Sequence, residues 1–223
     1  MLDYGYYNMD CMEGMKQFSD KYFDLAIVDP PYGIGECGTK NHTRSKLAKA
    51  KQYKAFAGND QKPPDETYFS ELFRVSKKQI IFGANHFISK FQLDSSCWIV
   101  WDKDNGENDF ADCELAWTSF DSAVRKFKFR WAGMLQENMK NKEFRIHPTQ
   151  KPVALYEWIL TNYAQPGFKI LDTHVGSASS LIACHNLGFD YVGFELDPEY
   201  YKASYERLQS VKNQMSIFDY IQR

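Results

Sequence analysis

The tetrapeptide Asp29-Pro30-Pro31-Tyr32 directly follows an apolar run that ends at Val28. Two prolines remove two backbone N–H donors and fix φ, so the Asp29 carboxylate and the Pro30 carbonyl are held as acceptors. Two such acceptors can grip the hydrogens of an –NH₂ group and favour a pyramidal nitrogen whose lone pair can attack. Tyr32 supplies a ring on which a nucleobase can stack. The segment therefore predicts a site that activates an exocyclic amine, and a simple strand stop with a rim aromatic is the alternative.

A second strand end has the pattern of a nucleotide-binding turn. The run 169–171 leads into Asp172, and Gly176 then permits close approach of the backbone before an apolar helix. Glu195 follows the next apolar run, where a carboxylate can accept hydrogen bonds from ribose hydroxyls. This spacing also suits a dinucleotide enzyme, although GxGxxG is absent. An ordinary strand–helix junction is the other interpretation.

Short apolar runs alternate with helical patterns along the chain. The predicted strands are Phe23 to Val28, Gln79 to Phe82, Trp98 to Trp101, Cys113 to Thr118, Phe168 to Leu171 and Tyr191 to Phe194. The predicted helices are Met12 to Phe18, Thr67 to Val75, Pro152 to Tyr163, Ser179 to Leu187 and Glu199 to Leu208. This alternation predicts a doubly wound, Rossmann-like α/β fold with a mostly parallel sheet and helices on both faces. Ligands bind such sheets at the carboxyl ends of the strands, so Asp29 and Asp172 are expected to share one crevice.

The composition narrows the class of protein. The chain has 223 residues, of which 43% are hydrophobic, and a net charge of −2, which is typical of one globular domain. No run approaches the ~18–20 apolar residues of a membrane span, and the amino end lacks signal-peptide features, so a cytoplasmic location is expected. The five cysteines lie far apart without zinc spacing, which predicts reduced thiols and no metal site; Cys97 and Cys113 are assigned to packing.

Together the two strand ends resemble those of the amino-group DNA methyltransferases that use S-adenosylmethionine. In that family a (D/N/S)PP(Y/F/W) motif, here residues 29–32, holds the amine, and a D-x-F-x-G-S-G-type motif, here residues 172–179, wraps the methionine part of the cofactor. Residues 147–152 resemble its HPTQKP segment, which contacts the cofactor. Residues 8–11 resemble its N-G-D-C opening, whose Asp faces the adenine end. The motif order is similar to that of the permuted β group.

The chain departs from the family pattern at three positions, Met9, His174 and Ala178. Similar cofactor turns occur in phage and prophage members, which the chain also resembles at residues 69–76 and at Glu114-Leu115-Ala116-Trp117. His174 is interpreted as a tolerated wall residue. The resemblance implies catalytic residues at Asp29, Pro30, Pro31 and Tyr32, and cofactor contacts at Asp10, Cys11, His147, Thr149, Gln150, Lys151, Asp172, His174, Gly176, Ser177, Glu195 and Leu196.

An aspartate in the first motif position resembles the adenine-specific members, so the expected reaction is methylation of adenine N6 in DNA. Cytosine-N4 methylation, methylation of an amine in RNA or of a protein glutamine, and a non-catalytic DNA-binding module with a decayed fold are the alternatives. DNA is the expected partner, with no membrane. A homodimer and a restriction-enzyme partner are left open.

Two basic segments are candidates for contact with DNA phosphates. The alternatives are that the first is only a solvated insertion and that the second is only an edge strand whose lysines discourage aggregation. One lies within a loop insertion at about 33–60 that follows the catalytic motif, and the other lies within a small DNA-recognition segment at about 120–146, both in a single methyltransferase domain spanning 1–223. Their basic residues are Lys40, Arg44, Lys46, Lys49, Lys51 and Lys54 in the first, and Arg125, Lys126, Lys128 and Arg130 in the second.

Overall fold

The computed structural model describes residues 2–35, 60, 62–106, 111–132 and 135–221, with side chains up to residue 214. One eight-stranded sheet runs through the molecule in the order β1-β10-β9-β2-β3-β5-β4-β6. Its strands are β1 Gly5–Asn8, β2 Phe23–Val28, β3 Ser76–Phe82, β4 Trp98–Asp102, β5 Cys113–Thr118, β6 Arg125–Lys128, β9 Lys169–Asp172 and β10 Asp190–Glu195. A small two-stranded sheet is formed by β7 Trp131–Ala132 and β8 Leu135–Gln136.

Within the large sheet, β5 alone among the described strands runs opposite to its neighbours, since it pairs antiparallel with both β3 and β4. The chain between β4 and β5 spans residues 103–112, which is too short for the helical crossover that parallel neighbours need. Every other pairing in this sheet is parallel. The prediction of a mostly parallel, doubly wound sheet is confirmed.

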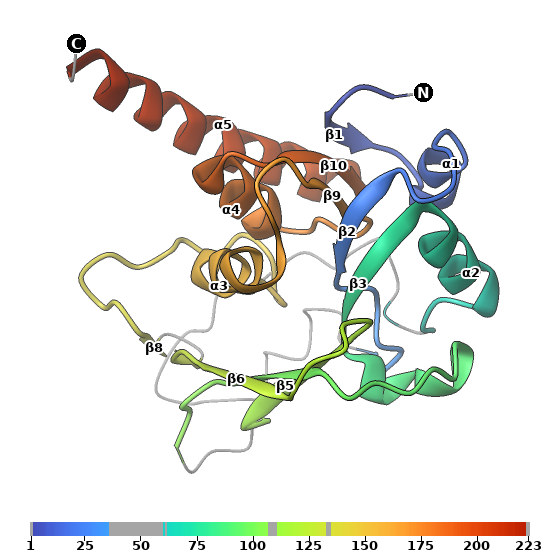
Figure 1. Ribbon diagram of the computed structural model, residues 1–223. Helices are drawn as coiled ribbons and strands as arrows, with labels where there is room; N and C mark the ends of the chain where they lie inside the picture. Colours follow the sequence, from blue (N-terminus) through green and yellow to red (C-terminus); the bar gives the residue numbers. More distant parts are fainter. Residues whose placement is uncertain (1, 36–59, 61, 107–110, 133–134, 222–223) are drawn as a thin grey trace.

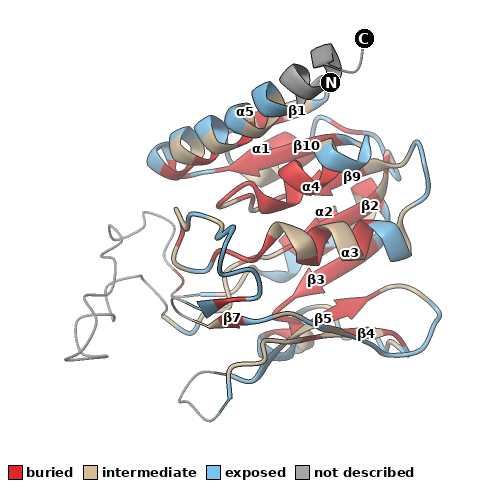
Figure 2. Ribbon diagram, turned by 90° about the vertical axis from the view of Figure 1, so that its left-hand side faces the viewer, coloured by how far each residue is buried: buried red, intermediate tan, exposed pale blue. Residues whose placement is uncertain are grey.

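Helices cover both faces because the central strands are apolar on both. In β2, Leu25 and Ile27 belong to one core, while Ala26 and Val28 belong to the other. The first core is closed by α3 Val153–Tyr163, α4 Ser179–Leu187 and α5 Pro198–Ile221, and the second by α1 Cys11–Met15 and α2 Glu66–Val75 (Figure 1). Figure 2 shows the central strands β2, β3 and β9 as buried. Successive side chains of β2 thus alternate between the two cores, and this alternation fixes the register of a sheet that is buried on both faces.

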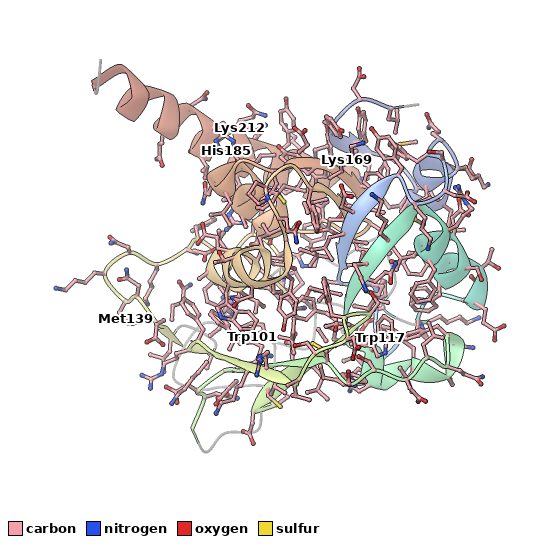
Figure 3. All side chains as sticks on the ribbon, viewed as in Figure 1. Trp101, Trp117, Met139, Lys169, His185 and Lys212 are labelled. Atoms are coloured by element: carbon pink, nitrogen blue, oxygen red, sulfur yellow. The ribbon has the colours of Figure 1, made fainter. Side chains whose placement is uncertain are left out.

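Beyond β3 the sheet continues with β5 and β4, and each of these strands buries a tryptophan. Trp101 of β4 packs into the first core and Trp117 of β5 into the second (both labelled in Figure 3). Short 3-10 turns at Ala84–His86 and Ile88–Lys90 follow β3 and cover the second face.

The helix boundaries follow local capping chemistry. The Asp10 side chain accepts hydrogen bonds from two backbone N–H groups of α1, and Asp65 caps α2 through the N–H of Tyr68. Gly188 ends α4 in the left-handed conformation. In the described residues, no helix is long and apolar enough to cross a membrane.

All six predicted strands and all five predicted helices are present, with shifted ends for several of them. The sequence prediction omitted β1, β7 and β8, and it treated β6 only as the edge-strand alternative. It also ended the last helix at Leu208, thirteen residues before Ile221, where α5 ends. Cys113 was wrongly assigned to packing: it is exposed at the start of β5, whereas Cys97 is buried.

Candidate active site

The site residues meet at one edge of the sheet. β2 and β9 are neighbours, with Ala26 opposite Leu171, so Asp29 and Asp172 follow adjacent parallel strands. The carboxyl ends of β1, β10, β3 and β4 lie at the same edge, and so does the amino end of β5, because β5 runs the other way. The expectation that the two marked strand ends are neighbours is confirmed.

The Asp29 carboxylate has a partner on each oxygen. Oδ1 accepts a hydrogen bond from the Tyr32 hydroxyl at 2.7 Å, and Oδ2 accepts one from the Lys151 ammonium. Pro30 is buried beside it. Each carboxylate oxygen has two acceptor positions, so Asp29 retains capacity for further donors. The turn thus presents a fixed, partly buried acceptor at the strand end.

The Tyr32 ring packs against His86 and Gly83. It stacks on the His86 ring with centroids 5.2 Å apart and an interplanar angle of 16°. On another side it lies against Gly83, where an added Cβ would come within 2.1 Å of the ring. Gly83 has φ +67°, a conformation that favours glycine. Burial, followed by the negative charge of Asp29, raises the pKa of Tyr32 well above its ordinary value, so the phenol stays protonated and donates.

A chain of four charged side chains, of which Lys151 is buried and the others are partly buried, starts at Asp29. Lys151, whose side chain is only 4% exposed, lies between Asp29 and Glu114, with 3.1 Å between Nζ and Glu114 Oε2. The other oxygen of Glu114 pairs with Lys103. Burial opposes the charge of Glu114, but Lys151 and Lys103 outweigh it and lower the pKa of Glu114 to about 2. Burial likewise opposes the charge of Lys151, but Asp29 and Glu114 outweigh it and raise its pKa. Glu114 and Lys151 are therefore both charged at neutral pH.

The predicted cofactor turn after β9 is held from several sides. Asp172 accepts hydrogen bonds from the Ser180 hydroxyl and from the His174 N–H, the latter at 3.0 Å. Thr173 Oγ1 is 2.7 Å from the hydroxyl of Tyr68 in α2 and 2.9 Å from Nδ1 of His174. Burial lowers the pKa of His174 to about 4, so the ring in the position of the family's usual phenylalanine is neutral. Its role as a wall residue of the cofactor site stays a prediction.

Glu195 ties the turn to the first strand. Its two carboxylate oxygens accept the N–H groups of Gly176 at 2.8 Å and Asp197 at 2.9 Å, while its carbonyl accepts from Met9 N–H at 3.1 Å. Asn8 pairs with Glu195 in the sheet, which brings Asp10, the next residue but one, to the same edge. Asp10 and Glu195 thus lie together although they are almost a chain length apart.

The segment 147–152 closes the other side of the turn. The His147 ring is 3.9 Å from the position a Cβ of Gly176 would take, and its Nδ1 is 3.0 Å from Thr149 Oγ1. Burial and then Lys151 lower the pKa of His147 to about 4, so it is neutral at neutral pH. Gln150 is buried and fixes the segment by accepting from the N–H of Ile146 at 2.9 Å. The side chain of Lys151 points away from this turn, to Asp29.

Two of the predicted cofactor residues, Leu196 and Cys11, lie at the margin of the predicted cofactor site. Leu196 is 59% exposed directly after β10. Cys11 begins α1, and burial, followed by the charge of Asp10, raises the pKa of its thiol to about 12, so it is not a nucleophile at neutral pH.

Arg207 of α5 was not predicted from the sequence. Its guanidinium donates to the Ser177 carbonyl at 2.6 Å and pairs with Glu143 at 2.6 Å, which braces the turn against the chain that precedes α3. Glu114 and Lys103 were also missed as site residues. The only sequence signal was the Glu114-Leu115-Ala116-Trp117 motif, to which no role had been assigned.

The second basic segment is largely paired with acids. Lys126 bonds to Asp102, while Lys128 and Arg130 bond to Asp104 at 2.8 and 2.6 Å. Arg125 is exposed at the start of the edge strand β6. The first segment, with Lys40, Arg44, Lys46, Lys49, Lys51 and Lys54, lies outside the described residues.

The comparisons with known proteins agree with this geometry. Residues 42–206 match the family model N6_N4_Mtase, described as "DNA methylase". The Type II methyltransferase M.HpaI of Haemophilus parainfluenzae is 25% identical over 252 residues, which cover 94% of this chain and 76% of M.HpaI. The crystal structure of the M1.HpyAVI–SAM complex is similar with a TM-score of 0.56 and 22% identity, over 91% of this chain and 98% of that one. The cytosine-N4-specific PvuII DNA methyltransferase is similar with a TM-score of 0.57 and 12% identity, over 96% and 93%.

The chain belongs to this DNA methylase family of S-adenosylmethionine-dependent amino-methyltransferases. The recognition of an S-adenosylmethionine-dependent amino-methyltransferase from the motifs is therefore confirmed, and so is the Rossmann-like methyltransferase fold; the resemblance to the permuted β group and to phage members stays a prediction.

The residues at the turn fit the cofactor of this family. Gly176, at φ +55°, leaves the backbone open to close approach, because the nearest atoms to a Cβ built there, those of the His147 ring, are 3.9 Å away. Carboxylates at Asp10 and Glu195 suit hydroxyl and amino donors. Ala178 has φ +62° where the family has glycine, and it is fully buried. A left-handed alanine costs roughly 1–2 kcal/mol, a strain that the surrounding packing of the turn offsets.

The buried Asp172 gives a prediction for stability against pH. Burial, only partly offset by Ser180, raises its pKa to about 7, so the folded chain keeps a proton that the unfolded chain has lost. Its contribution therefore falls as pH rises from about 4 to about 7. The lowered pKa values of His147 and His174 act in the opposite sense between about 4 and about 6.5. We expect the melting temperature of Asp172→Asn, relative to wild type, to increase from about pH 5 to about pH 8.

Thermal melting of both proteins across this range measures the difference directly. Asp24→Asn is the matched control: hydrogen bonds from Lys77 and from the Lys169 N–H lower the pKa of Asp24 despite its partial burial, so this variant should lose stability relative to wild type at neutral pH. A wild-type curve parallel to that of Asp172→Asn would contradict the assignment.

Proposed function

We propose that this protein transfers a methyl group from S-adenosylmethionine to the exocyclic N6 of adenine in DNA. The observation that carries the proposal is Asp29, held rigidly by two prolines at the carboxyl end of β2, beside the cofactor turn of β9. DNA as the substrate follows from the family. Adenine is proposed because aspartate in the first motif position resembles the adenine-specific members.

The proposed mechanism assigns binding and orientation to the chain's own residues. The target base, turned out of the duplex, stacks on Tyr32 and donates its amine hydrogens to Asp29 and to the Pro30 carbonyl. These acceptors leave the nitrogen lone pair free for in-line attack. As the N–C bond forms, the carboxylate of Asp29 stabilises the positive charge that develops on nitrogen, and it takes up the proton that the nitrogen then releases. S-adenosylmethionine, when bound, supplies the electrophilic methyl group and leaves as the neutral thioether.

The cofactor would be held between the three chain segments that meet around Gly176. Glu195 would accept hydrogen bonds from the ribose hydroxyls, and Asp10 would face the adenine end. Asp172, Ser177 and the segment 147–150 would line the methionine part. Arg207 would support this site from behind, since it donates to the Ser177 carbonyl and to the Ser179 hydroxyl.

DNA would lie along the edge of the sheet that carries Asp29. The proposed recognition segment, about 120–146, includes β6, β7, β8 and the following loop, with Met139 half exposed on it (Figure 3). Asp102 and Asp104 offset half of the four positive charges of its basic part. We therefore assign most of the phosphate contact to Lys40, Arg44, Lys46, Lys49, Lys51 and Lys54, which lie outside the described residues and follow the catalytic motif directly.

Neutralising Lys46, Lys49 and Lys51 together, by replacement with glutamine, is expected to weaken DNA binding for all sequences. The slope of log affinity against log salt should fall by up to about 0.9 for each phosphate that is no longer neutralised, because a bound lysine releases the counterions condensed on its phosphate. Binding titrations at several salt concentrations measure this slope.

A triple variant at Lys77, Lys78 and Lys169 is the matched control. These lysines begin β3 and β9 at the opposite edge of the sheet, so their neutralisation should leave the slope almost unchanged. An unchanged slope in the first variant would make the loop a solvated insertion and move the phosphate contacts to Arg125, Lys126, Lys128 and Arg130.

Nucleoside analysis tests the proposed substrate. The purified protein is incubated with labelled S-adenosylmethionine and separately with DNA, RNA and protein, and the DNA is digested to nucleosides. N6-methyladenine is the expected product, whereas N4-methylcytosine or label in RNA or protein would refute the adenine assignment. Calorimetric titration with S-adenosylmethionine separates an inactive, decayed module from an enzyme.

A further inference from the structure

Lys151 is a buried cation shared by two carboxylates. Its ammonium donates hydrogen bonds to Asp29 and to the Tyr32 hydroxyl, the latter at 3.2 Å, and forms an ion pair with Glu114. The partners come from different parts of the chain, since Asp29 follows β2 and Glu114 is the second residue of β5. A buried ammonium needs such partners, because an unpaired charge in the interior is strongly unfavourable.

The position of Lys151 conflicts with the work assigned to Asp29. In the proposed reaction Asp29 grips an amine and stabilises positive charge on its nitrogen. A cation bonded to the same carboxylate competes for its acceptor positions and opposes the growth of that charge. The site therefore needs a second anion that balances Lys151 while Asp29 serves the amine.

Glu114 is placed to be that anion. Its Oε2 is 3.1 Å from Lys151 Nζ, and Lys103 bonds to its other oxygen. The four charges sum to zero, and Lys151 can keep one carboxylate partner while the amine takes its place at Asp29. No shift of the backbone is needed, because the ammonium already lies between both carboxylates.

We propose that Glu114 is a positioning residue for amine methylation, acting through Lys151: it balances the charge of Lys151 so that Asp29 can receive the target amine. This inference rests on the proposed methylation of an amine at Asp29, whether that of adenine or of cytosine. It gives a role to the Glu114-Leu115-Ala116-Trp117 motif. It also changes the role assigned to the Lys151 side chain from cofactor binding to support of the amine site.

The test is a double-mutant cycle on total methyl transfer to DNA. Glu114→Gln leaves the full charge of Lys151 on Asp29, and Lys151→Met leaves one negative charge in excess among Asp29, Glu114 and Lys103. Each single variant is expected to reduce kcat about 10-fold or more. The double variant, which is again charge balanced, should be at least about 5-fold more active than Glu114→Gln. A residue that only packs would predict a double variant as impaired as the worse single variant.

The pH profile is the second readout. The titratable and charged groups that face Lys151 are Asp29, Glu114, Lys103, Tyr32, Tyr156, His147 and, beyond Asp29, Asp172. Removing the charge of Glu114 lowers the pKa of Lys151, so the rate of Glu114→Gln should rise more steeply than that of wild type between about pH 7 and about pH 10. The other groups are common to both proteins and cancel in the ratio of the two rates.

Three controls keep the outcomes distinct. Asp20→Asn removes an ion pair with Arg74 on the surface, far from this network in the fold, and should leave activity unchanged. Affinity for S-adenosylmethionine, measured by calorimetry, should be within about twofold of wild type in all variants. If a single variant does not fold, the double variant is compared with wild type and should retain activity within about tenfold.

Three results would overturn the inference, and two of them are kinetic: a double variant no more active than Glu114→Gln, or parallel pH profiles for Glu114→Gln and wild type. Loss of cofactor binding in Lys151→Met would do the same, since it would return Lys151 to the cofactor. Absence of methyl transfer by the wild-type protein would refute the proposed function instead, and methylation of cytosine would refute only its adenine assignment.

Discussion

Replacing Asp29 by alanine is expected to lower the rate of methyl transfer about 10²-fold or more, the usual consequence of removing one interaction made in the transition state. The change removes one of the two proposed amine acceptors and the charge that stabilises the nitrogen. It also deletes the acceptor to which the Tyr32 hydroxyl donates. Single-turnover assays with DNA and saturating cofactor measure the rate of the transfer step.

The fold and the cofactor site should survive this change. Lys151 keeps Glu114 as a partner, and no predicted cofactor residue except Lys151 bonds to Asp29, so affinity for S-adenosylmethionine should change little. Asp29→Asn is the graded control, because its amide oxygen still accepts a hydrogen bond but carries no charge; its rate should lie between those of wild type and Asp29→Ala. Near-normal turnover by Asp29→Ala would remove Asp29 from the mechanism.

The position of this aspartate could be predicted because its signal is local. An apolar run that ends in Asp29-Pro30-Pro31 marks both a buried strand and its end, and the run before Asp172 does the same. Parallel strands that are apolar on both faces must lie in the middle of a sheet. The apolar pattern of both runs therefore predicted that β2 and β9 are central strands. The rule that ligands bind at the carboxyl ends of strands then predicted that the two are neighbours.

The edges of the sheet gave no such signal. β1 has four residues, of which only Tyr6 is buried, and it exists because it pairs with β10 far along the chain, Tyr6 opposite Gly193. Strand β6 is almost entirely exposed, and its one phenylalanine among basic residues gives only a weak alternation. Both depend on a neighbour that the local sequence does not specify.

The site shows the same limit. Lys151 was grouped with the cofactor residues because it stands beside Thr149 and Gln150 in one motif, yet its side chain reaches Asp29, which is 122 positions away in sequence. Successive residues of an irregular segment can face opposite directions, so a motif fixes the place of its backbone and not the target of each side chain. Glu114 could not be recognised as a site residue until the antiparallel direction of β5 brought its amino end to the active edge.

Gly83→Ala is expected to be the second most damaging change, through the position of Tyr32. A Cβ at residue 83 would lie 2.1, 2.4 and 2.5 Å from three atoms of the Tyr32 ring, so the ring must move. It cannot move freely, because it stacks on His86 and its hydroxyl bonds to Asp29. A displaced ring loses both the stacking surface for the base and the alignment of Asp29. Stacking of one base on an aromatic ring contributes about 1–3 kcal/mol, so DNA affinity should fall about 10- to 100-fold, with a further loss in kcat.

Gly106→Ala separates this effect from backbone strain. Gly106 also has a positive φ, +64°, but no atom of the described residues lies within 4 Å of a Cβ built there, so the variant carries the same strain without the collision. In thermal melts Gly106→Ala should lose roughly 1–2 kcal/mol of stability, and Gly83→Ala should lose more, because the collision adds to the same backbone strain. Only Gly83→Ala should lose DNA methylation and base-dependent binding, measured with an oligonucleotide that contains the target site. Equal activity of the two variants would show that Tyr32 is not the surface on which the base stacks.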